Sequence, residues 1–323
     1  MPKQTIFSGI QPTGRLHLGN YLGSLRHFVE LQTKHDCYFM IADYHSITED
    51  YDPRRKRAQT LELAAEFLAA GLDPKKCTIF VQSDVPEHLE LAWIFNAITP
   101  ISLLERMTQY KDKAARQTKN INVGLFDYPV LQAADILLYH ATAVPVGADQ
   151  DQHLELTREI VRLFNNRFGA TFTEPKTLHT NVPKVMSLLA PDKKMSKSLG
   201  DAHCIHLDDE PDVVAAKISK AVTDTGGGTS LGAKNLLTMS EAFSSKKTYE
   251  SFLADSAEGT LQYAKLKQTL AKDIAGYFAD FRAEKKKLGA KRVEAILAAG
   301  KKRAAKTALK TMAAHLKRDC GNV

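Results

Sequence analysis

Residues 5–20 read TIFSGIQPTGRLHLGN, in which a short apolar run leads through a turn with glycine and proline into a helical pattern. The run 5–10 has the length and composition of a buried β-strand. From Leu18 to about Thr33, apolar side chains recur at helical spacing and predict an amphipathic helix. A strand, a turn and a helix in this order predict the first unit of an α/β fold.

The same alternation continues after this unit. Further strands are predicted at 37–42 and 78–82, and a helix at 87–97. Another helix is predicted between Asp52, which can cap its first turn, and Gly71, which can end it in a left-handed conformation. This order is typical of a doubly wound, Rossmann-like parallel sheet, whose ligands bind at the carboxyl ends of the strands.

The composition of the 323 residues, 44% hydrophobic and 25% charged, is that of a globular protein and excludes a disordered or collagen-like chain. The four cysteines, Cys37, Cys77, Cys204 and Cys320, are far apart and form no CxxC pair, so neither a zinc site nor a disulfide framework is predicted. No apolar run approaches the roughly 18 residues of a membrane span, and no signal peptide is evident. We therefore expect a cytoplasmic enzyme with no metal held by the protein itself.

The net charge of +7 is unevenly distributed. Residues 282–318 contain 13 Lys and Arg but only two acidic residues, a net +11 that leaves −4 for the rest of the chain. After about Asp212 the strand candidates fade, and helical stretches rich in Ala and Lys dominate. A basic helical region of this kind predicts an anionic partner such as RNA.

The turn QPTGRLHLGN at 11–20 has the character of a phosphate site. It follows a strand and opens a helix, so free backbone N–H groups and the positive end of the helix dipole face the ligand. Gly19 permits close approach, and His17 and Asn20 can donate hydrogen bonds to phosphate oxygens. The turn lacks the GxGxxG pattern of nicotinamide dinucleotide sites. Taken alone, it is also consistent with a loop whose histidine caps a helix.

A second candidate phosphate site is KMSKS at 194–198. Two lysines three residues apart, on a polar loop with interleaved serines, can surround a polyphosphate. Their ammonium groups would stabilise the charge that develops on a departing pyrophosphate, which is an electrostatic role rather than an acid–base role. Taken alone, such a loop is also consistent with an ordinary solvated surface segment.

Together, His17–Asn20 and Lys194–Ser198 resemble the HIGH and KMSKS motifs of the class I aminoacyl-tRNA synthetases. Among these, the resemblance is greatest to the bacterial-type tryptophanyl-tRNA synthetases. It extends over GIQPTG (9–14), NYLG (20–23), YPVL (128–131), AADILLY (133–139), VPVG (144–147), DQ (149–150) and QHLE (152–155). The resemblance is dense from about residue 5 to 200 and thin after about 225.

The resemblance implies a ligase that activates L-tryptophan with ATP to tryptophanyl-adenylate and pyrophosphate, and then transfers tryptophan to the 3′ end of tRNA(Trp). Magnesium would accompany the ATP phosphates. The resemblance also implies a homodimer, a catalytic domain at 1–210 with a helical connective insertion, and an α-helical anticodon-binding domain at 211–323. The last helix, from about Lys291, would pack back onto the catalytic domain.

The resemblance further implies a set of nucleotide-binding residues. The catalytic residues would be His17, Asn20, Lys194, Lys197 and Ser198. ATP would also contact Gln11, Pro12, Thr13, Gly19, Gly147, Ala148, Asp149, Val185, Met195 and Ser196, with Lys111 and Lys113 as further phosphate ligands. The last two lysines are also consistent with an exposed helix face. Ala148 departs from the family, which usually has Glu there, and this leaves Asp149 to bind the ribose.

The amino-acid pocket rests on Asp135. An indole offers one N–H donor and no acceptor, so its pocket needs one buried acceptor among apolar walls. Asp135 lies in an apolar helical segment and matches the family's indole-binding aspartate. The matching wall and polar positions are Phe7, Tyr128, His45, Gln132, Val146 and Gln150. His45 is also consistent with a polar residue satisfied after its strand.

Gln132 is a second departure, because many tryptophan enzymes have Met there. It lies one turn before Asp135, and a Gln–Asp pair suits a phenol, which both donates and accepts. A tyrosine-specific relative is therefore the nearest alternative. A nucleotidyltransferase acting on a small molecule is a further alternative, although it would not need the basic helical region.

Overall fold

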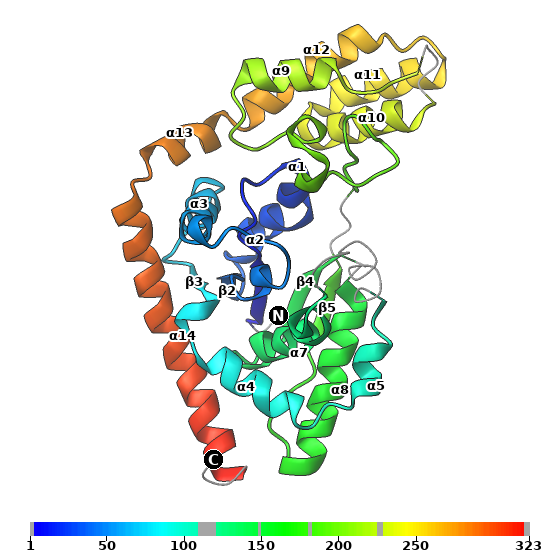
Figure 1. The fold of residues 1–323 in the computed structure, drawn as a ribbon. Coiled ribbons are helices and arrows are strands. Elements are labelled where there is room, and N and C mark those ends of the chain that lie inside the picture. The colour runs from blue at the N-terminus through cyan, green and yellow to red at the C-terminus, as the bar shows by residue number, and fades with distance from the viewer. Residues whose placement is uncertain (1–2, 109–120, 148–149, 180–182, 225–228, 320–323) are drawn as a thin grey trace. The chain divides into compact units, whose positions relative to one another are not determined.

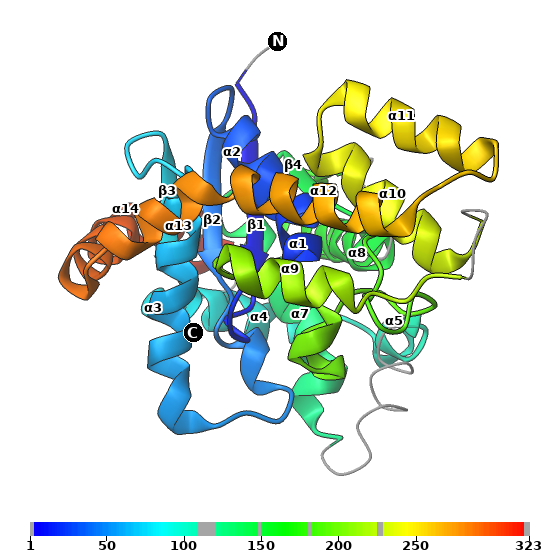
Figure 2. The same ribbon diagram turned by 90° about the horizontal axis from the view of Figure 1, so that it is seen from above.

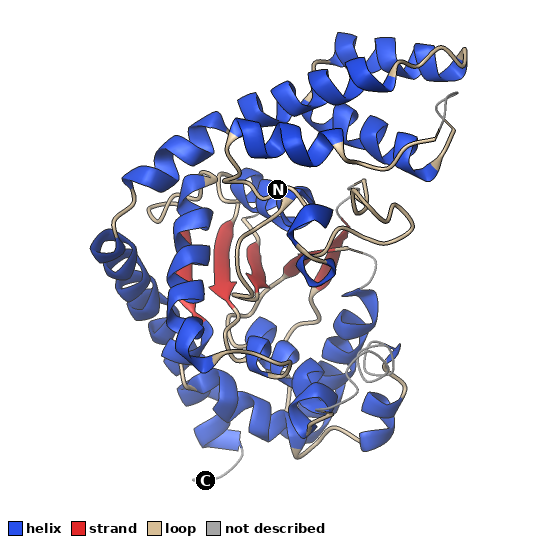
Figure 3. Cartoon of the chain, turned by 45° about the horizontal axis from the view of Figure 1, so that its top comes forward, coloured by secondary structure: helices blue, strands red, loops and turns tan. Residues whose placement is uncertain are grey.

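The computed structural model describes residues 3–108, 121–147, 150–179, 183–224 and 229–319. Five parallel strands form one sheet in the order β3-β2-β1-β4-β5 (Figure 3). They are β1 (Thr5–Ile10), β2 (Asp36–Ile41), β3 (Cys77–Val81), β4 (Ala143–Val146) and β5 (Lys176–His179). The chain extends the sheet on one side of β1 and then on the other, so a topological switch lies between β1 and β4. The predicted doubly wound α/β fold is confirmed.

The chain divides into two compact units that do not follow the sequence in order. Unit 1 comprises residues 1–14, 27–181 and 289–323, and unit 2 comprises residues 15–26 and 182–288. These units reflect packing and differ from the division at residue 210 that the resemblance implies. The expected catalytic and anticodon-binding domains remain a prediction about function.

Unit 1 contains the sheet and the helices that surround it. The helices are α3 (Pro53–Ala69), α4 (Glu87–Asn96), α5 (Ile101–Glu105), α7 (Val123–Leu137), α8 (Asp151–Phe168) and α14 (Ala290–Asp319). The predicted ends of α3 are confirmed: the carboxylate of Asp52 accepts from the N–H of Arg54 at 3.0 Å, and Gly71 has φ +104°. The core includes the fully buried rings of Phe80, Phe95 and Phe164.

The long helix α14 covers the edge strand β3 (Figure 1). Gly300 makes this approach possible, since a Cβ there would lie 1.7 Å from the carbonyl oxygen of Ile79. Arg303 donates to the carbonyl of Cys77, and Thr311 donates to the carbonyl of Leu138. An unpaired strand edge is thereby protected from pairing with another chain.

Unit 2 is mainly helical. Its helices are α1 (Leu18–Asn20), α9 (Pro211–Ser219), α10 (Leu231–Phe243), α11 (Lys246–Ala257), α12 (Tyr263–Tyr277) and α13 (Ala279–Lys287). Helix α12 packs against both α9 and α10 (Figure 2). After α1 the chain forms a π-helical turn, Tyr21–Leu25, and continues into α2 (Arg26–Leu31), so the predicted helical segment is confirmed with a change of winding.

Residues 15–26 belong to unit 2 because of their backbone and ring contacts. Leu18 donates to the carbonyl of Ile205, and Leu207 donates to the carbonyl of Leu16. The ring of Tyr21 lies edge-on to that of Phe278, with centroids 4.9 Å apart. This segment is therefore fastened to residues that lie far downstream in the sequence.

Cys37, Cys77 and Cys204 are buried free thiols, and Cys320 lies outside the described residues. Burial raises the pKa of Cys37 and that of Cys77 to about 12. In the part of the chain that the structure describes, no helix is both long enough and apolar enough to cross a membrane.

Candidate active site

Asp135 lies in unit 1 on α7, where its carboxylate accepts hydrogen bonds from three side chains. His45, after β2, donates from Nε2 to Oδ2 at 2.7 Å, and His88 on α4 donates from Nδ1 to Oδ1 at 2.6 Å. Gln82, at the end of β3, donates from Nε2 to both oxygens at 2.8 and 3.0 Å. The carboxyl ends of β2 and β3 thus supply donors to one carboxylate, as their position in a parallel sheet allows.

These donors keep Asp135 ionised although it is only 1% exposed. Burial alone would raise its pKa, but the hydrogen bonds and charges of the His45 and His88 imidazoles outweigh burial and lower the pKa to about 2. An ionised carboxylate can only accept, so both imidazoles must donate to it. Because Gln82 bonds both oxygens, four hydrogen bonds already occupy the roughly four lone-pair sites of the carboxylate, and a further N–H donor would take the place of one of them.

Tyr139 extends this network by one further hydrogen bond. Its hydroxyl lies 2.9 Å from Nε2 of His88. Burial, followed by the charge of Asp135, raises the pKa of Tyr139 far above its usual value, so the hydroxyl keeps its proton. The hydrogen bond between this hydroxyl and His88 fixes the imidazole so that Nδ1–H points at Asp135. Phe7 stacks on Tyr139 with ring centroids 5.5 Å apart, so an expected wall residue packs against the network.

The other expected pocket residues lie around the same part of unit 1. Tyr128 is buried on the same helix as Asp135, α7. Its hydroxyl lies 2.9 Å from Nε2 of His153 on α8. Burial raises the pKa of Tyr128 to about 12. Val146, Gln150 and Gln132 are half-buried. Among the hydrogen bonds of the described residues, none joins Gln132 to Asp135.

Four expected nucleotide-binding positions also belong to unit 1. Gln11 and Thr13 form a tight turn after β1, in which the N–H of Thr13 donates to the carbonyl of Gln11, and Pro12 between them is buried. Gly147 directly follows β4 and is half-buried. The expected ligands Lys111, Lys113, Ala148 and Asp149 lie outside the described residues.

In unit 2, His17 caps α1 and is only 6% exposed. Its Nδ1 accepts from the N–H of Gly19 at 3.1 Å, and Oδ1 of Asn20 accepts from the N–H of His17 at 3.2 Å. A Cβ on Gly19 would lie 3.0 Å from the His17 ring, so glycine suits this contact. The capping bond holds Nδ1 as an acceptor and leaves the ring proton on Nε2, where it can be donated to a ligand.

The charge state of His17 follows from its surroundings. Desolvation, followed by the positive charges of Lys197, His206 and Lys194, lowers its pKa to about 3. His17 is therefore neutral at physiological pH. The effect of Lys194 and Lys197 on His17 shows that the histidine and lysine motifs lie near each other within unit 2.

The lysine motif is built on a short antiparallel pairing, with a bridge between Met186 and Lys194. Met195 donates to the carbonyl of Val185 at 3.0 Å, and Ser187 donates to the carbonyl of Lys193 at 2.8 Å. Met195 is buried, whereas Lys194 and Ser198 are exposed and Lys197 is half-buried. Ser196 caps the 3₁₀ turn Lys197–Leu199 by accepting from the N–H of Ser198.

Ion pairs anchor the segment before His17. Arg15 donates to Asp208 at 2.8 and 2.6 Å and to Asp209 at 2.6 Å. Lys285 on α13 donates to Asp208, and Lys217 on α9 donates to Asp209. These contacts hold Arg15 and the residues that follow it within unit 2.

Sequence reasoning missed Gln82, His88 and Tyr139 as supports of Asp135. Gln82 had a signal, because a polar side chain at the carboxyl end of a buried parallel strand is a candidate site residue. His88 lies on α4 at a position that no spacing rule connects with Asp135, and Tyr139, in the turn after α7, acts on Asp135 only through His88. Arg15 and its two aspartates were also missed, since about 190 residues separate the partners.

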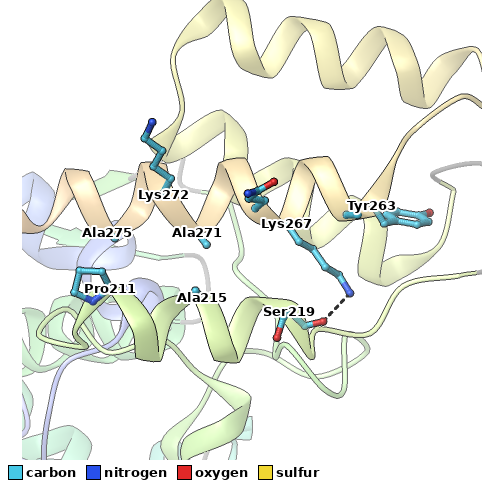
Figure 4. Close-up of a pocket in the computed structure, with 10 residues that line it drawn as sticks. Pro211, Ala215, Ser219, Tyr263, Lys267, Ala271, Lys272 and Ala275 are labelled. Carbon is cyan, nitrogen blue, oxygen red and sulfur yellow. Dashed lines mark hydrogen bonds between the residues drawn. The ribbon is translucent and has the colours of Figure 1, made fainter.

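A separate cavity of about 850 Å³ lies between α9 and α12 (Figure 4). It is lined by small side chains such as Ala215 and Ala271 and by Tyr263 and Lys267. Lys267 donates to the carbonyl of Ser219, so its ammonium caps the end of α9. None of the expected site residues that the structure describes lines this cavity.

Comparisons with known proteins agree with these features. Residues 2–279 match the model of the tRNA synthetases class I (W and Y). The chain is 43% identical over 315 residues to the tryptophan–tRNA ligase of Caldanaerobacter subterraneus subsp. tengcongensis, covering 95% of each chain. It is 50% identical over 229 residues to that of Helicobacter pylori, covering 70% of each chain.

A solved structure is similar over nearly the whole chain. The tryptophanyl-tRNA synthetase of Campylobacter jejuni, complexed with ADP and tryptophan, has a TM-score of 0.86 and 34% sequence identity, covering 98% of this chain and 99% of that one. On the family match and the identity over 95% of its length, the chain belongs to the tryptophanyl-tRNA synthetase family of class I tRNA synthetases.

Proposed function

We propose that this protein activates L-tryptophan with ATP and transfers it to the 3′ end of tRNA(Trp). The observation that carries the amino-acid assignment is the buried, ionised carboxylate of Asp135, which three donors hold in place. An acceptor of this kind, among apolar and aromatic side chains, suits a ligand with a single N–H. The Campylobacter jejuni relative is a complex with tryptophan and ADP, which supports both ligands.

In the amino-acid site, Asp135 would accept the indole N–H in place of one of the four hydrogen bonds that its carboxylate receives in this structure. Its 1% exposure excludes water as a competitor and strengthens the bond. Phe7, Tyr128, His45 and Val146 would form the walls, and Gln150 would contact the amine or carboxylate. The identity of 43% and 50% to two tryptophan–tRNA ligases supports tryptophan rather than tyrosine.

In the nucleotide site, a carboxylate oxygen of tryptophan would attack the α-phosphorus of ATP, and the bond between that phosphorus and the leaving pyrophosphate would break. Negative charge then builds on the leaving group. Lys194 and Lys197 would stabilise this charge, with Ser198 as a further donor. His17 would donate from Nε2 and Asn20 from its amide. Because the pKa of His17 is about 3, its role is to donate a hydrogen bond and not to transfer a proton.

The remaining nucleotide contacts are proposals of the same kind. ATP would also contact Gln11, Pro12, Thr13, Gly19, Gly147, Val185, Met195 and Ser196. The two lysines near His17 are cations, which fit phosphate oxygens and not a metal ion. Mg²⁺ would therefore enter on the nucleotide phosphates, where it neutralises their charge.

The transfer step requires tRNA. The basic stretch 282–318 supports this partner. Each tRNA phosphate that its lysines and arginines neutralise adds to the affinity, and this contribution weakens as the salt concentration rises. A homodimer and a cytoplasmic location are part of the same proposal. Sedimentation velocity tests the dimer.

The test of the proposed function is pyrophosphate exchange into ATP, measured with tryptophan and with tyrosine side by side. Exchange that depends on tryptophan supports the proposal, and charging of tRNA(Trp) completes it. Exchange driven by tyrosine would instead assign the pocket to a phenol. No exchange with either amino acid would overturn the synthetase function.

A further inference from the structure

The extended segment 185–188 has hydrogen-bonded partners on both of its edges. On one edge, Val185 and Ser187 pair with the lysine segment through Met195 and Lys193. On the other edge, the carbonyl of Leu188 accepts from the N–H of Val222 at 2.8 Å, and its N–H donates to the carbonyl of His203. The segment therefore connects the catalytic lysines with another part of unit 2.

The central contact of this second edge comes from one side chain. Oδ1 of Asn235, on α10, accepts from the N–H of Met186 at 2.8 Å, and its Nδ2 donates to the carbonyl of Met186 at 2.9 Å. The amide thus satisfies both backbone groups of Met186, as a neighbouring strand would. Asn235 is 4% exposed, so water cannot replace these bonds at low cost.

Helix α10 is itself fixed at this point. Gly232, one turn before Asn235, lies so close to Val222 that a Cβ there would be 1.9 Å from its carbonyl oxygen. The close packing of Gly232 against Val222 therefore fixes the position of the helix that carries Asn235. Met186, which Asn235 holds, is also the residue that bridges to Lys194.

We propose that Asn235 is a positioning residue for adenylate formation. It fixes the register of segment 185–188 and, through the bridge of Met186, the position of Lys194 and Met195. A slip of one residue would turn each side chain of the paired segment to the opposite face. This inference rests on the proposed function, since it concerns the lysines that stabilise the leaving pyrophosphate.

The first test is Asn235→Ala in the full-length protein, assayed by tryptophan-dependent pyrophosphate exchange. We expect kcat/KM for ATP to fall about 10- to 100-fold, the loss typical of misplaced catalytic groups. Tryptophan affinity, measured by calorimetry, is expected to stay unchanged because Asp135 belongs to unit 1. The matched control is Ser240→Ala, a buried polar residue of the same helix that bonds Ser244 instead of segment 185–188.

A second variant, Asn235→Asp, tests the bonding pattern if the alanine variant folds poorly. Aspartate has the shape of asparagine, but only its protonated form can both accept from and donate to Met186. Burial raises the pKa of such a carboxyl group. We therefore expect its activity relative to wild type to rise as the pH falls, whereas the Ser240→Ala ratio stays constant.

The outcomes separate this inference from the proposed function. Wild-type kcat/KM for ATP in Asn235→Ala, or an Asn235→Asp ratio that does not change with pH, would overturn the positioning role. Loss of exchange in the wild-type protein itself would overturn the proposed function instead. If kcat/KM for ATP fell equally in Ser240→Ala, the loss would reflect the general stability of α10. This result would also overturn the positioning role.

Discussion

The Asp135 network and the lysine segment use opposite physical means to hold a charge. Asp135 is a buried anion whose side chain is held directly by other side chains. Lys194 is an exposed cation whose backbone is held and whose side chain extends into solvent. The first arrangement suits recognition of a fixed, neutral N–H donor. The second suits a flexible polyphosphate whose charge changes during the reaction.

The largest expected effect comes from the lysine segment. Lys197→Ala is expected to lower the rate of adenylate formation by about 10²- to 10³-fold, since the leaving group loses a stabilising charge in the transition state. Tryptophan affinity is expected to be unchanged by calorimetry. Lys193→Ala, an exposed lysine of the same segment, is the control. Near-wild-type turnover of Lys197→Ala would refute the assigned role.

Asp135→Ala is expected to weaken tryptophan binding by about 10- to 100-fold, because it removes the charged partner of the indole N–H. It also leaves the donors of His45, His88 and Gln82 unsatisfied, so its thermal stability should fall. Asp135→Asn keeps the shape and separates the two effects. Unchanged tryptophan affinity in a folded Asn variant would contradict the proposed pocket.

His17 is expected to act as a neutral donor. His17→Ala should lower kcat/KM for ATP by about 10-fold or more, since a hydrogen bond to charged phosphate is lost. His17→Gln places an N–H near the position of Nε2 and should retain more activity. A Gln variant no better than the Ala variant would point to the capping bond with Gly19 as the important contact.

Tyr139→Phe is expected to have a smaller effect. Losing the hydroxyl that orients His88 should weaken tryptophan binding about 5-fold, which corresponds to one hydrogen bond of the supporting network. KM for ATP should not change. An altered KM for ATP with normal tryptophan affinity would contradict this role, because it would show that Tyr139 affects the nucleotide site and not the tryptophan pocket.

The two regions should also respond to acid in different pH ranges. The pKa of His17 is lowered from 6.5 to about 3, so the unfolded chain binds a proton that the folded state excludes, and stability falls as the pH decreases from 6.5 towards 3. The pKa of Asp135 is lowered from 3.8 to about 2, so its contribution is lost only below 3.8. Urea unfolding at several pH values checks this. The free energy of unfolding of His17→Gln should change less with pH between 6.5 and 3 than that of the wild type, and its loss below pH 3.8 should be unchanged.

Sequence patterns predicted β1, β2, β3 and the two ends of α3 because these depend on neighbouring residues. The apolar run 5–10 is β1, and Asp52 caps α3 at its first turn. Spacing could not connect His88 with Asp135 or Arg15 with Asp208, since these pairs depend on how separate elements pack. Lys111, Lys113, Ala148 and Asp149 lie outside the described residues, so their roles stay predictions.

The sequence by itself determined the alternation of strands and helices, the family and the chemistry that His17, Asp135 and the lysines offer. Only the tertiary structure decided which groups surround them: three donors around one carboxylate, a capped and neutral histidine, and an asparagine from α10 that holds Met186. The physical reason is range. Propensity, capping and turn chemistry act within a few residues, whereas pKa values and the positions of reactive groups depend on contacts between segments far apart in the chain.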